Sequence, residues 1–84
     1  MEKSRKKLLK IDKKIIQLLG DRMKISQEIG NYKKQNKIEH KQTKYWKETE
    51  IIRNNWATEQ NVEQNFIKKL FNAIRRESLR IQKK

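Results

Sequence analysis

The sequence contains no cysteine, no proline and a single histidine, His40. Without cysteine the chain can form neither a disulfide framework nor a thiolate metal cluster, and one histidine cannot build a site of its own. With 84 residues there is room for one domain at most, so we expect residues 1–84 to form a single domain and exclude a two-domain enzyme. Stability must therefore come from the packing of side chains.

Long hydrophobic runs are also missing. The N-terminal segment from Met1 to Lys7 is basic, and charged residues interrupt the apolar ones in the segment 8–14 that follows. A signal peptide or a membrane span needs a longer uninterrupted apolar segment than this. We therefore expect a cytoplasmic protein.

Positive charge is what the sequence has in excess. It contains 23 Lys and Arg residues against 10 Asp and Glu, which gives a formal net charge of +13. This balance favours anionic partners. Because 17 of the 23 basic residues are Lys, a common surface residue, the charge indicates the sign of a ligand and not its identity.

The lack of proline and the small number of turn formers favour long helices, and the spacing of apolar residues predicts three of them. They cover approximately residues 4–36, 43–58 and 61–82, with a loop over 36–42. Side chains that accept hydrogen bonds from the first turn of a helix are typical N-terminal caps. The predicted caps are Ser4, Thr43 and Asn61.

The first helix is too long for a compact chain of this size. It carries an apolar heptad seam from Leu8 to Tyr32, and it would be about 45 Å long at 1.5 Å per residue. A compact chain of this length has a diameter of only roughly 30 Å. A second copy of the chain would most simply cover the overhang, so we predict an all-α fold of three helices, long, short and medium, in an intertwined helical-bundle homodimer.

Arg22 interrupts the heptad seam of the first helix. It could pair with a Glu of a neighbouring helix, or extend its guanidinium past the seam into solvent. Alternatively it could bind an anion. Lys33 follows eleven residues later and returns to within about 20° of the same face, roughly 16 Å along the axis. Together the two cations could bracket a small polyanion.

Ser78 and Gln82 lie one turn apart and continue the apolar stripe of the third helix. They could belong to a frayed terminus, or they could form a hydrogen-bonding wall for a ligand in the bundle. Arg5 lies near the seam at the other end of the first helix, some 42 Å from Lys33 along the axis. Within one chain these two cannot bind one small ligand, but in an antiparallel dimer Arg5 could approach the middle of the other copy.

The usual sets of catalytic residues are absent from the sequence. It has no Ser/His/Asp or Cys/His set, no glycine-rich phosphate loop, no metal-ligand spacing and no acid–base pair suited to hydrolysis. If the chain is an enzyme, it must work by positioning and electrostatics.

Five segments together resemble the all-helical class of chorismate mutase. They are Ser4–Asp12, Leu18–Met23, Glu28–Lys34, Lys69–Ile74 and Glu77–Gln82. The resemblance implies an intertwined three-helix dimer that converts chorismate to prephenate by a pericyclic rearrangement, with no cofactor and no metal. Such an isomerase belongs to the shikimate pathway and serves the synthesis of Phe and Tyr.

Site residues carry over from the family by position. Arg22, together with Arg5 of the partner chain, would bind the two carboxylates of chorismate, where the guanidinium fork can form paired hydrogen bonds. Lys33 and Gln82 would donate hydrogen bonds to the ether oxygen, on which negative charge develops in the transition state. Ser78 would help to place a carboxylate.

The second helix departs from the family, which has an Asp, an Arg and a Glu there. An ungapped alignment places Gln42, Tyr45 and Trp46 at these positions. A loop that is two residues longer places Lys44, Lys47 and Glu48 there. We prefer the longer loop because it keeps Ile51 and Ile52 on the family's apolar pair, and a bundle changes loop length more readily than register. Glu48 would then hold the substrate hydroxyl, whereas Lys44 reverses the sign of the Asp and Lys47 replaces an Arg fork by a point charge.

Three alternatives stay open. The first is the isochorismate pyruvate-lyase reaction, which uses the same scaffold. The second is a basic helical dimer that binds nucleic acid, although the Lys residues are spread along the chain and no recognition motif is present. The third is a degenerate family member that is kept as a non-catalytic dimer.

Overall fold

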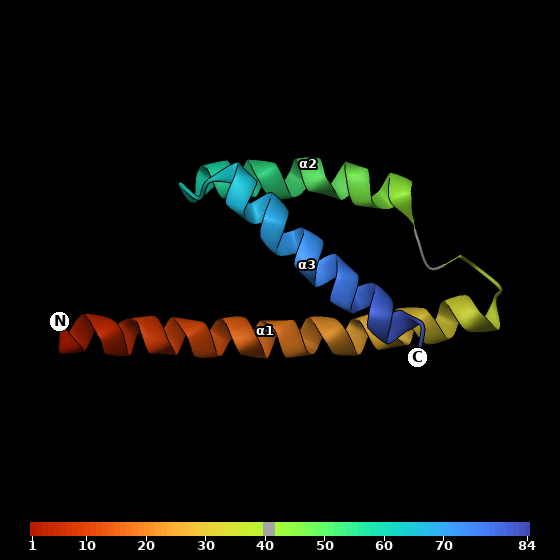
Figure 1. Cartoon of the computed structure of the whole chain (residues 1–84), viewed down its shortest axis with the longest axis horizontal. Coiled ribbons are helices and arrows are strands. Elements are labelled where there is room, and N and C mark those ends of the chain that lie inside the picture. Colours follow the sequence, from red (N-terminus) through yellow and green to blue (C-terminus); the bar gives the residue numbers. More distant parts are fainter. Residues whose placement is uncertain (40–41) are drawn as a thin grey trace.

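The computed structural model describes residues 1–39 and 42–84, which form three helices (Figure 1). They are α1 (Glu2–Gln35), α2 (Thr43–Glu59) and α3 (Gln64–Gln82). No strand occurs in the described residues. The prediction of an all-α chain with a long, a short and a medium helix is therefore confirmed. Among the described residues, none of these helices contains an apolar stretch of the length that a membrane span requires.

The predicted helix caps were wrong. The N-cap residues are Met1, Gln42 and Glu63, and none of them makes a side-chain capping hydrogen bond. Asn61 instead adopts a left-handed conformation with φ 57°. The backbone N–H groups of Asn61 and Val62 donate to the carbonyls of Thr58 and Ala57, respectively. Asn61 therefore ends α2 in a Schellman-type turn, a geometry that asparagine tolerates better than most residues.

The same kind of turn ends α1. Lys37 is left-handed with φ 54°, and the N–H of Ile38 donates to the carbonyl of Lys33 at 2.8 Å. This bond spans the last turn and reverses the chain directly after the helix. It holds Ile38 close to the C-terminal end of α1, where a cavity described below begins.

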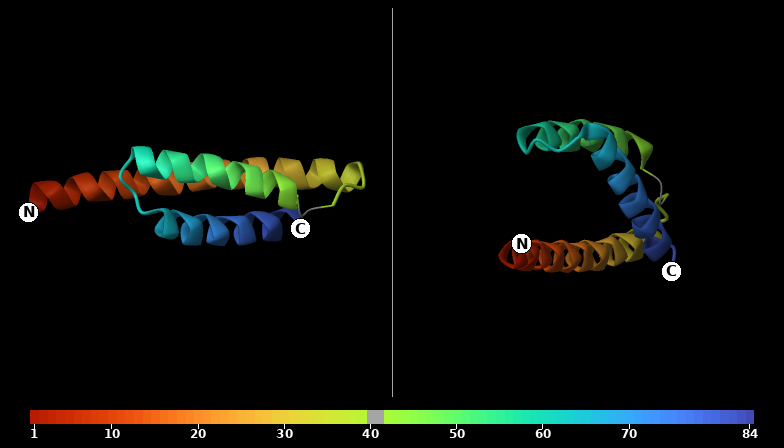
Figure 2. Two further views of the ribbon diagram at one scale, coloured as in Figure 1. Left: turned by 90° about the horizontal axis from the view of Figure 1, so that it is seen from above. Right: turned by 60° about the vertical axis from the view of Figure 1, so that its left-hand side comes forward.

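The three helices form an open bracket (Figure 2). Both α1 and α2 pack on α3, whereas α1 and α2 make no close backbone contact with each other within the described residues. The chain measures 52 × 24 × 15 Å and its radius of gyration is 15.4 Å, against about 12 Å for a compact chain of this length. The N-terminal end of α1 projects beyond the other two helices (Figure 1).

The apolar seam of α1 is left uncovered by this arrangement. Leu18 is 67% exposed and Leu8 is 60% exposed. Trp56 on α2 is also 60% exposed. Among the described residues, only Ala57 and Ile74 are buried hydrophobic side chains. A single chain therefore leaves most of its large hydrophobic side chains exposed, and exposed apolar patches of this kind are typical of interaction surfaces.

Candidate active site

The C-terminal end of α3 crosses α1 through polar side chains. Ser26 and Lys33 come from α1, Ser78 and Gln82 come from α3, and all four are buried. Burial of a polar group is unfavourable unless the group finds a hydrogen-bond partner. The described residues include few buried hydrophobic side chains. Because these helices instead bury polar side chains where they cross, the crossing indicates a functional site.

These buried groups bond to one another across the two helices. The ammonium Nζ of Lys33 donates to Oε1 of Gln82 at 3.0 Å. Ser26 lies two turns before Lys33 in α1, and Ser78 lies one turn before Gln82 in α3. The hydroxyls of these two serines form a hydrogen bond with each other. Arg22 Nη1 lies 3.4 Å from Oγ of the same Ser78, to which it donates. A row of cationic and neutral donors thus follows the crossing, with Arg22 at one end and Lys33 at the other.

Gly30 allows the two helices to come this close. A Cβ atom at residue 30 would lie 2.6 Å from both the Cα and the carbonyl oxygen of Gln82. Backbone atoms cannot rotate away, so a larger residue would push the helices apart. At Gly20, by contrast, an added Cβ would meet nothing within 4 Å. The glycine at residue 30 therefore sets the distance across which Lys33 reaches Gln82.

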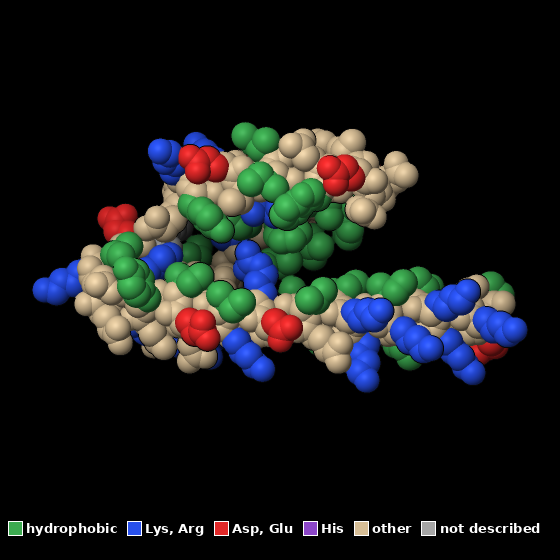
Figure 3. Space-filling view, turned by 180° about the vertical axis from the view of Figure 1, so that it is seen from behind, with side chains coloured by type: hydrophobic (Ala, Val, Ile, Leu, Met, Phe, Trp, Pro, Cys, Tyr) green, Lys and Arg blue, Asp and Glu red, His purple; other side chains and the backbone are tan. Residues whose placement is uncertain are grey.

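A cavity of about 620 Å³ opens beside the crossing, between α1, α3 and the start of α2. Its apolar walls include Ile25, Ile29 and Leu79, and its aromatic residues are Tyr32, Tyr45 and Trp46. Figure 3 shows the hollow between α1 and α2, with hydrophobic side chains on both sides. Hydrophobic walls with a few placed polar groups are typical of sites for small molecules. The charged and hydrogen-bonding side chains around it are Arg22, Ser26, Lys33, Gln42, Arg75, Ser78 and Gln82.

The structure brings four of the expected site residues together and leaves Arg5 outside. Arg22, Lys33, Ser78 and Gln82 all line this cavity. Arg5 lies near the N-terminus of α1, where its side chain is 68% exposed and 3.8 Å from Glu2. Within its own chain Arg5 therefore cannot reach the cavity.

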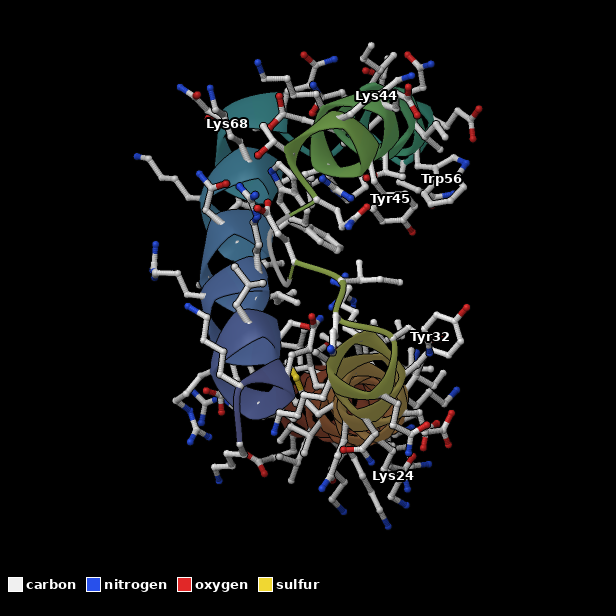
Figure 4. All side chains as sticks on the ribbon, turned by 90° about the vertical axis from the view of Figure 1, so that its right-hand side faces the viewer. Lys24, Tyr32, Lys44, Tyr45, Trp56 and Lys68 are labelled. Atoms are coloured by element: carbon white, nitrogen blue, oxygen red, sulfur yellow. The ribbon has the colours of Figure 1, made fainter. Side chains whose placement is uncertain are left out.

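The start of α2 presents the residues of the ungapped alignment to the cavity. Gln42, Tyr45 and Trp46 line it, and Figure 4 shows Tyr45 pointing towards α1 while Lys44 points away. The structure does not bring the alternative set there: Lys44 and Glu48 pair at 4.0 Å on the exposed face, and Lys47 is exposed. A register shift of two residues turns a helix by about 200°, so only one of the two sets can face α1.

Two functional candidates were not expected from the sequence. Ser26 lies one turn after Arg22, and Arg75 lies one turn before Ser78. Both line the cavity. The i, i+4 and i, i+3 spacing that singled out Ser78 and Gln82 would also have found them, because neighbours at this spacing share a helix face.

The cations near the cavity influence one another. Burial lowers the pKa of the Arg53 guanidinium, and the positive charges of Arg22 and Arg75 lower it further, while Glu50 opposes the effect. Burial also lowers the pKa of Lys33. No Asp or Glu of the described chain lines the cavity. The site is therefore built to receive negative charge.

Comparison with known proteins identifies the family. No curated protein and no solved structure matches the chain closely enough to count as similar. A family model does match: that of chorismate mutase type II, over residues 4–83. This covers nearly all of the sequence and includes every residue described at the cavity. The chain belongs to the chorismate mutase type II family.

Proposed function

We propose that this protein is a chorismate mutase, an isomerase that converts chorismate to prephenate in the cytoplasm for the synthesis of Phe and Tyr. The observation that carries the proposal is the buried pair Lys33 and Gln82, hydrogen-bonded at 3.0 Å on the wall of a cationic cavity. Membership of the family supports the same reaction.

The pair suits the rearrangement because of where charge develops. One C–O bond of chorismate breaks while one C–C bond forms, and negative charge gathers on the ether oxygen in the transition state. Lys33 can direct an ammonium N–H to that oxygen. Since Oε1 of Gln82 accepts from Lys33, its amide nitrogen is the group that can donate to the substrate. Bonds that strengthen as charge develops lower the barrier, and donors that are already in place need no reorganisation.

Arg22 and Ser78 suit the binding of one carboxylate of the substrate. The guanidinium of Arg22 lies 3.4 Å from the Ser78 hydroxyl, so both donors can address one anion. An Arg fork binds a carboxylate through two parallel hydrogen bonds and fixes its orientation. We assign the partner subunit's Arg5 to the other end of the substrate, which requires a homodimer.

The exposed seam of α1 supports that homodimer. Leu8, Ile11, Ile15 and Leu18 are each at least half exposed in the single chain and follow heptad spacing. A second, antiparallel copy would cover this seam and bring its own N-terminal end towards the cavity. We therefore propose two sites per dimer, each built mainly by one chain and completed by the other.

The direct test is an assay with purified protein at micromolar concentration. The loss of chorismate and the appearance of prephenate are followed, while circular dichroism and light scattering report helical folding and dimer mass. We expect turnover in the wild type and its loss in Arg22→Ala, with the dimer retained. A folded dimer that forms no prephenate would contradict the proposal. Release of pyruvate from isochorismate, without mutase activity, would identify the lyase instead.

A further inference from the structure

Arg75 is a cation that lines the cavity, but the proposed mechanism assigns it no role. It lies on α3, one turn before Ser78, and lines the cavity together with Trp46. Its guanidinium carbon is 4.9 Å from the centre of the Trp46 indole. None of the ion pairs among the described residues includes Arg75. The guanidinium is thus held by an aromatic face and not by a carboxylate.

Trp46 is itself held firmly in place. The guanidinium carbon of Arg53 lies 3.9 Å from the centre of the same indole and 5.1 Å from that of Phe71. Arg53 also donates to the backbone carbonyl of Trp46 at 3.5 Å and to Oγ1 of Thr49 at 3.0 Å. These contacts fix the indole within α2 and against α3. A fixed aromatic face can in turn fix the guanidinium of Arg75 by cation–π attraction.

The contact with the indole leaves Arg75 able to bind a ligand. Cation–π attraction uses the face of the planar guanidinium, whereas hydrogen bonds to a carboxylate use its N–H groups, which lie in the plane. Both interactions can therefore form at once. The cavity lining contains Arg22, Lys33 and Arg75, and no Asp or Glu of the described chain lies among them. A dianion in the cavity would relieve the repulsion among these cations.

We propose that Arg75 binds a carboxylate of the dianionic substrate, and that Trp46 is the positioning residue that aims its guanidinium. This inference rests on the proposed function for the identity of the substrate. Arg22 and Arg75 together give each chain two guanidinium groups for two carboxylates. Arg75 binds the second carboxylate together with the partner subunit's Arg5, which completes the site.

The test compares Arg75→Gln with Arg76→Gln. Arg76 is the adjacent residue of the same type, is exposed and does not line the cavity, so it is a matched control. The affinity for prephenate is measured by calorimetry, and kcat and KM are measured with chorismate. We expect Arg75→Gln to weaken prephenate binding about tenfold or more, because charge-assisted hydrogen bonds are lost, and Arg76→Gln to change it less than about twofold.

Two further variants examine the positioning role. Trp46→Phe keeps an aromatic face and should keep most of the affinity, whereas Trp46→Leu should approach Arg75→Gln. In an Arg75→Gln background, Trp46→Leu should weaken prephenate binding little further, since the residue it positions is already gone. If Arg75→Gln fails to fold, Arg75→Lys replaces it: the charge remains, the fork is lost, and the affinity for prephenate should still fall.

The outcomes separate this inference from the proposed function. If the wild type turns over chorismate and Arg75→Gln binds prephenate as well as Arg76→Gln does, the inference is overturned and the function stands. If the wild type binds prephenate through Arg75 but does not turn over chorismate, the function is overturned and the role of Arg75 stands. A folded wild type that neither turns over chorismate nor binds prephenate overturns both.

Discussion

Replacement of Gly30 by Ala is expected to reduce catalysis sharply, because Gly30 sets the spacing between the two helices that carry Lys33 and Gln82. The added Cβ would lie 2.6 Å from the backbone of Gln82, whereas ordinary contact begins at 3.4 Å, so α3 has to retreat by about 0.8 Å. A shift of this size along the line between the two side chains would stretch their 3.0 Å bond to about 3.8 Å, beyond hydrogen-bonding range.

The effect on rate should be large and the effect on stability small. A displacement of about 1 Å at an active site can cost about 10²-fold in rate, which is the fall in kcat that we expect. The free energy of unfolding should change little, because two contributions to it partly cancel. Ala favours a helix over Gly by about 1 kcal/mol, whereas overpacking costs about 1–3 kcal/mol. Steady-state kinetics with chorismate and urea unfolding of the same samples measure the two quantities.

Gly20→Ala provides the matched control. It makes the same chemical change in the same helix, but its Cβ meets nothing within 4 Å. We expect an unchanged kcat and a free energy of unfolding raised by about 1 kcal/mol. A Gly30→Ala variant with wild-type kcat would refute the spacing argument.

Three further predictions follow from the same geometry. Burial lowers the pKa of Lys33 below its ordinary 10.5, so as the pH rises its ammonium loses a proton earlier than that of an ordinary lysine. We therefore expect kcat/KM, which reports the free enzyme, to fall on the alkaline side. The fall in kcat should come at higher pH, because a bound dianion stabilises the charged lysine. Lys34→Ala, which changes the exposed neighbour, should keep the same profile, and a flat profile up to pH 10.5 would exclude this role for Lys33. Arg5→Ala and Lys33→Ala homodimers should each be nearly inactive. A refolded mixture of the two variants should regain activity, because each mixed dimer has one site with both residues intact. Mixed dimers that are seen by native mass spectrometry but show no activity would contradict a shared site. Leu18 is a seam position that is 67% exposed in one chain, so Leu18→Glu should dissociate the dimer, as measured by light scattering. Lys24→Glu changes an exposed residue that points away from α2 (Figure 4) and should leave the dimer intact. An intact Leu18→Glu dimer would show that the seam is not the interface.

The sequence predicts the part of the site that follows from helical periodicity. Arg22 and Lys33 share one face of α1, Ser78 and Gln82 share one face of α3, and the structure places all four on one cavity. Spacing within a helix is enough for this, because neighbours three or four residues apart always lie side by side. The three helices were predictable for the same reason.

Helical periodicity did not predict the helix ends or the register of α2. Asn61 has the side chain of an N-cap, but the backbone bonds that end α2 use it as a left-handed turn residue. The register of α2 depends on how many residues the preceding loop contains, which periodicity cannot fix. The apolar pair Ile51 and Ile52 favoured the longer loop, yet both are exposed in the single chain, so in one chain they do not determine which face of α2 meets α3.

The contact between Arg75 and Trp46 could not be predicted before the packing of α2 on α3 was known. The spacing of Arg75 from Ser78 places it on the correct side of α3, but its contact with Trp46 joins two helices across a distance in sequence that no local pattern reports. Arg22 and Lys33 were singled out by their spacing on α1, but most of the other basic residues are solvent-exposed and carry no such signal. The three-dimensional arrangement was needed to add Arg75 to the cations of the cavity.

The most direct measurement is the conversion of chorismate by the purified wild type and by its Lys33→Ala variant, with dimer mass and helix content recorded for both. A cavity that binds a dianion and supports charge on the ether oxygen predicts prephenate formation by the wild type and its near-complete loss in the variant, with both proteins folded. A folded wild-type dimer that leaves chorismate unchanged, or a Lys33→Ala variant as active as the wild type, would contradict it.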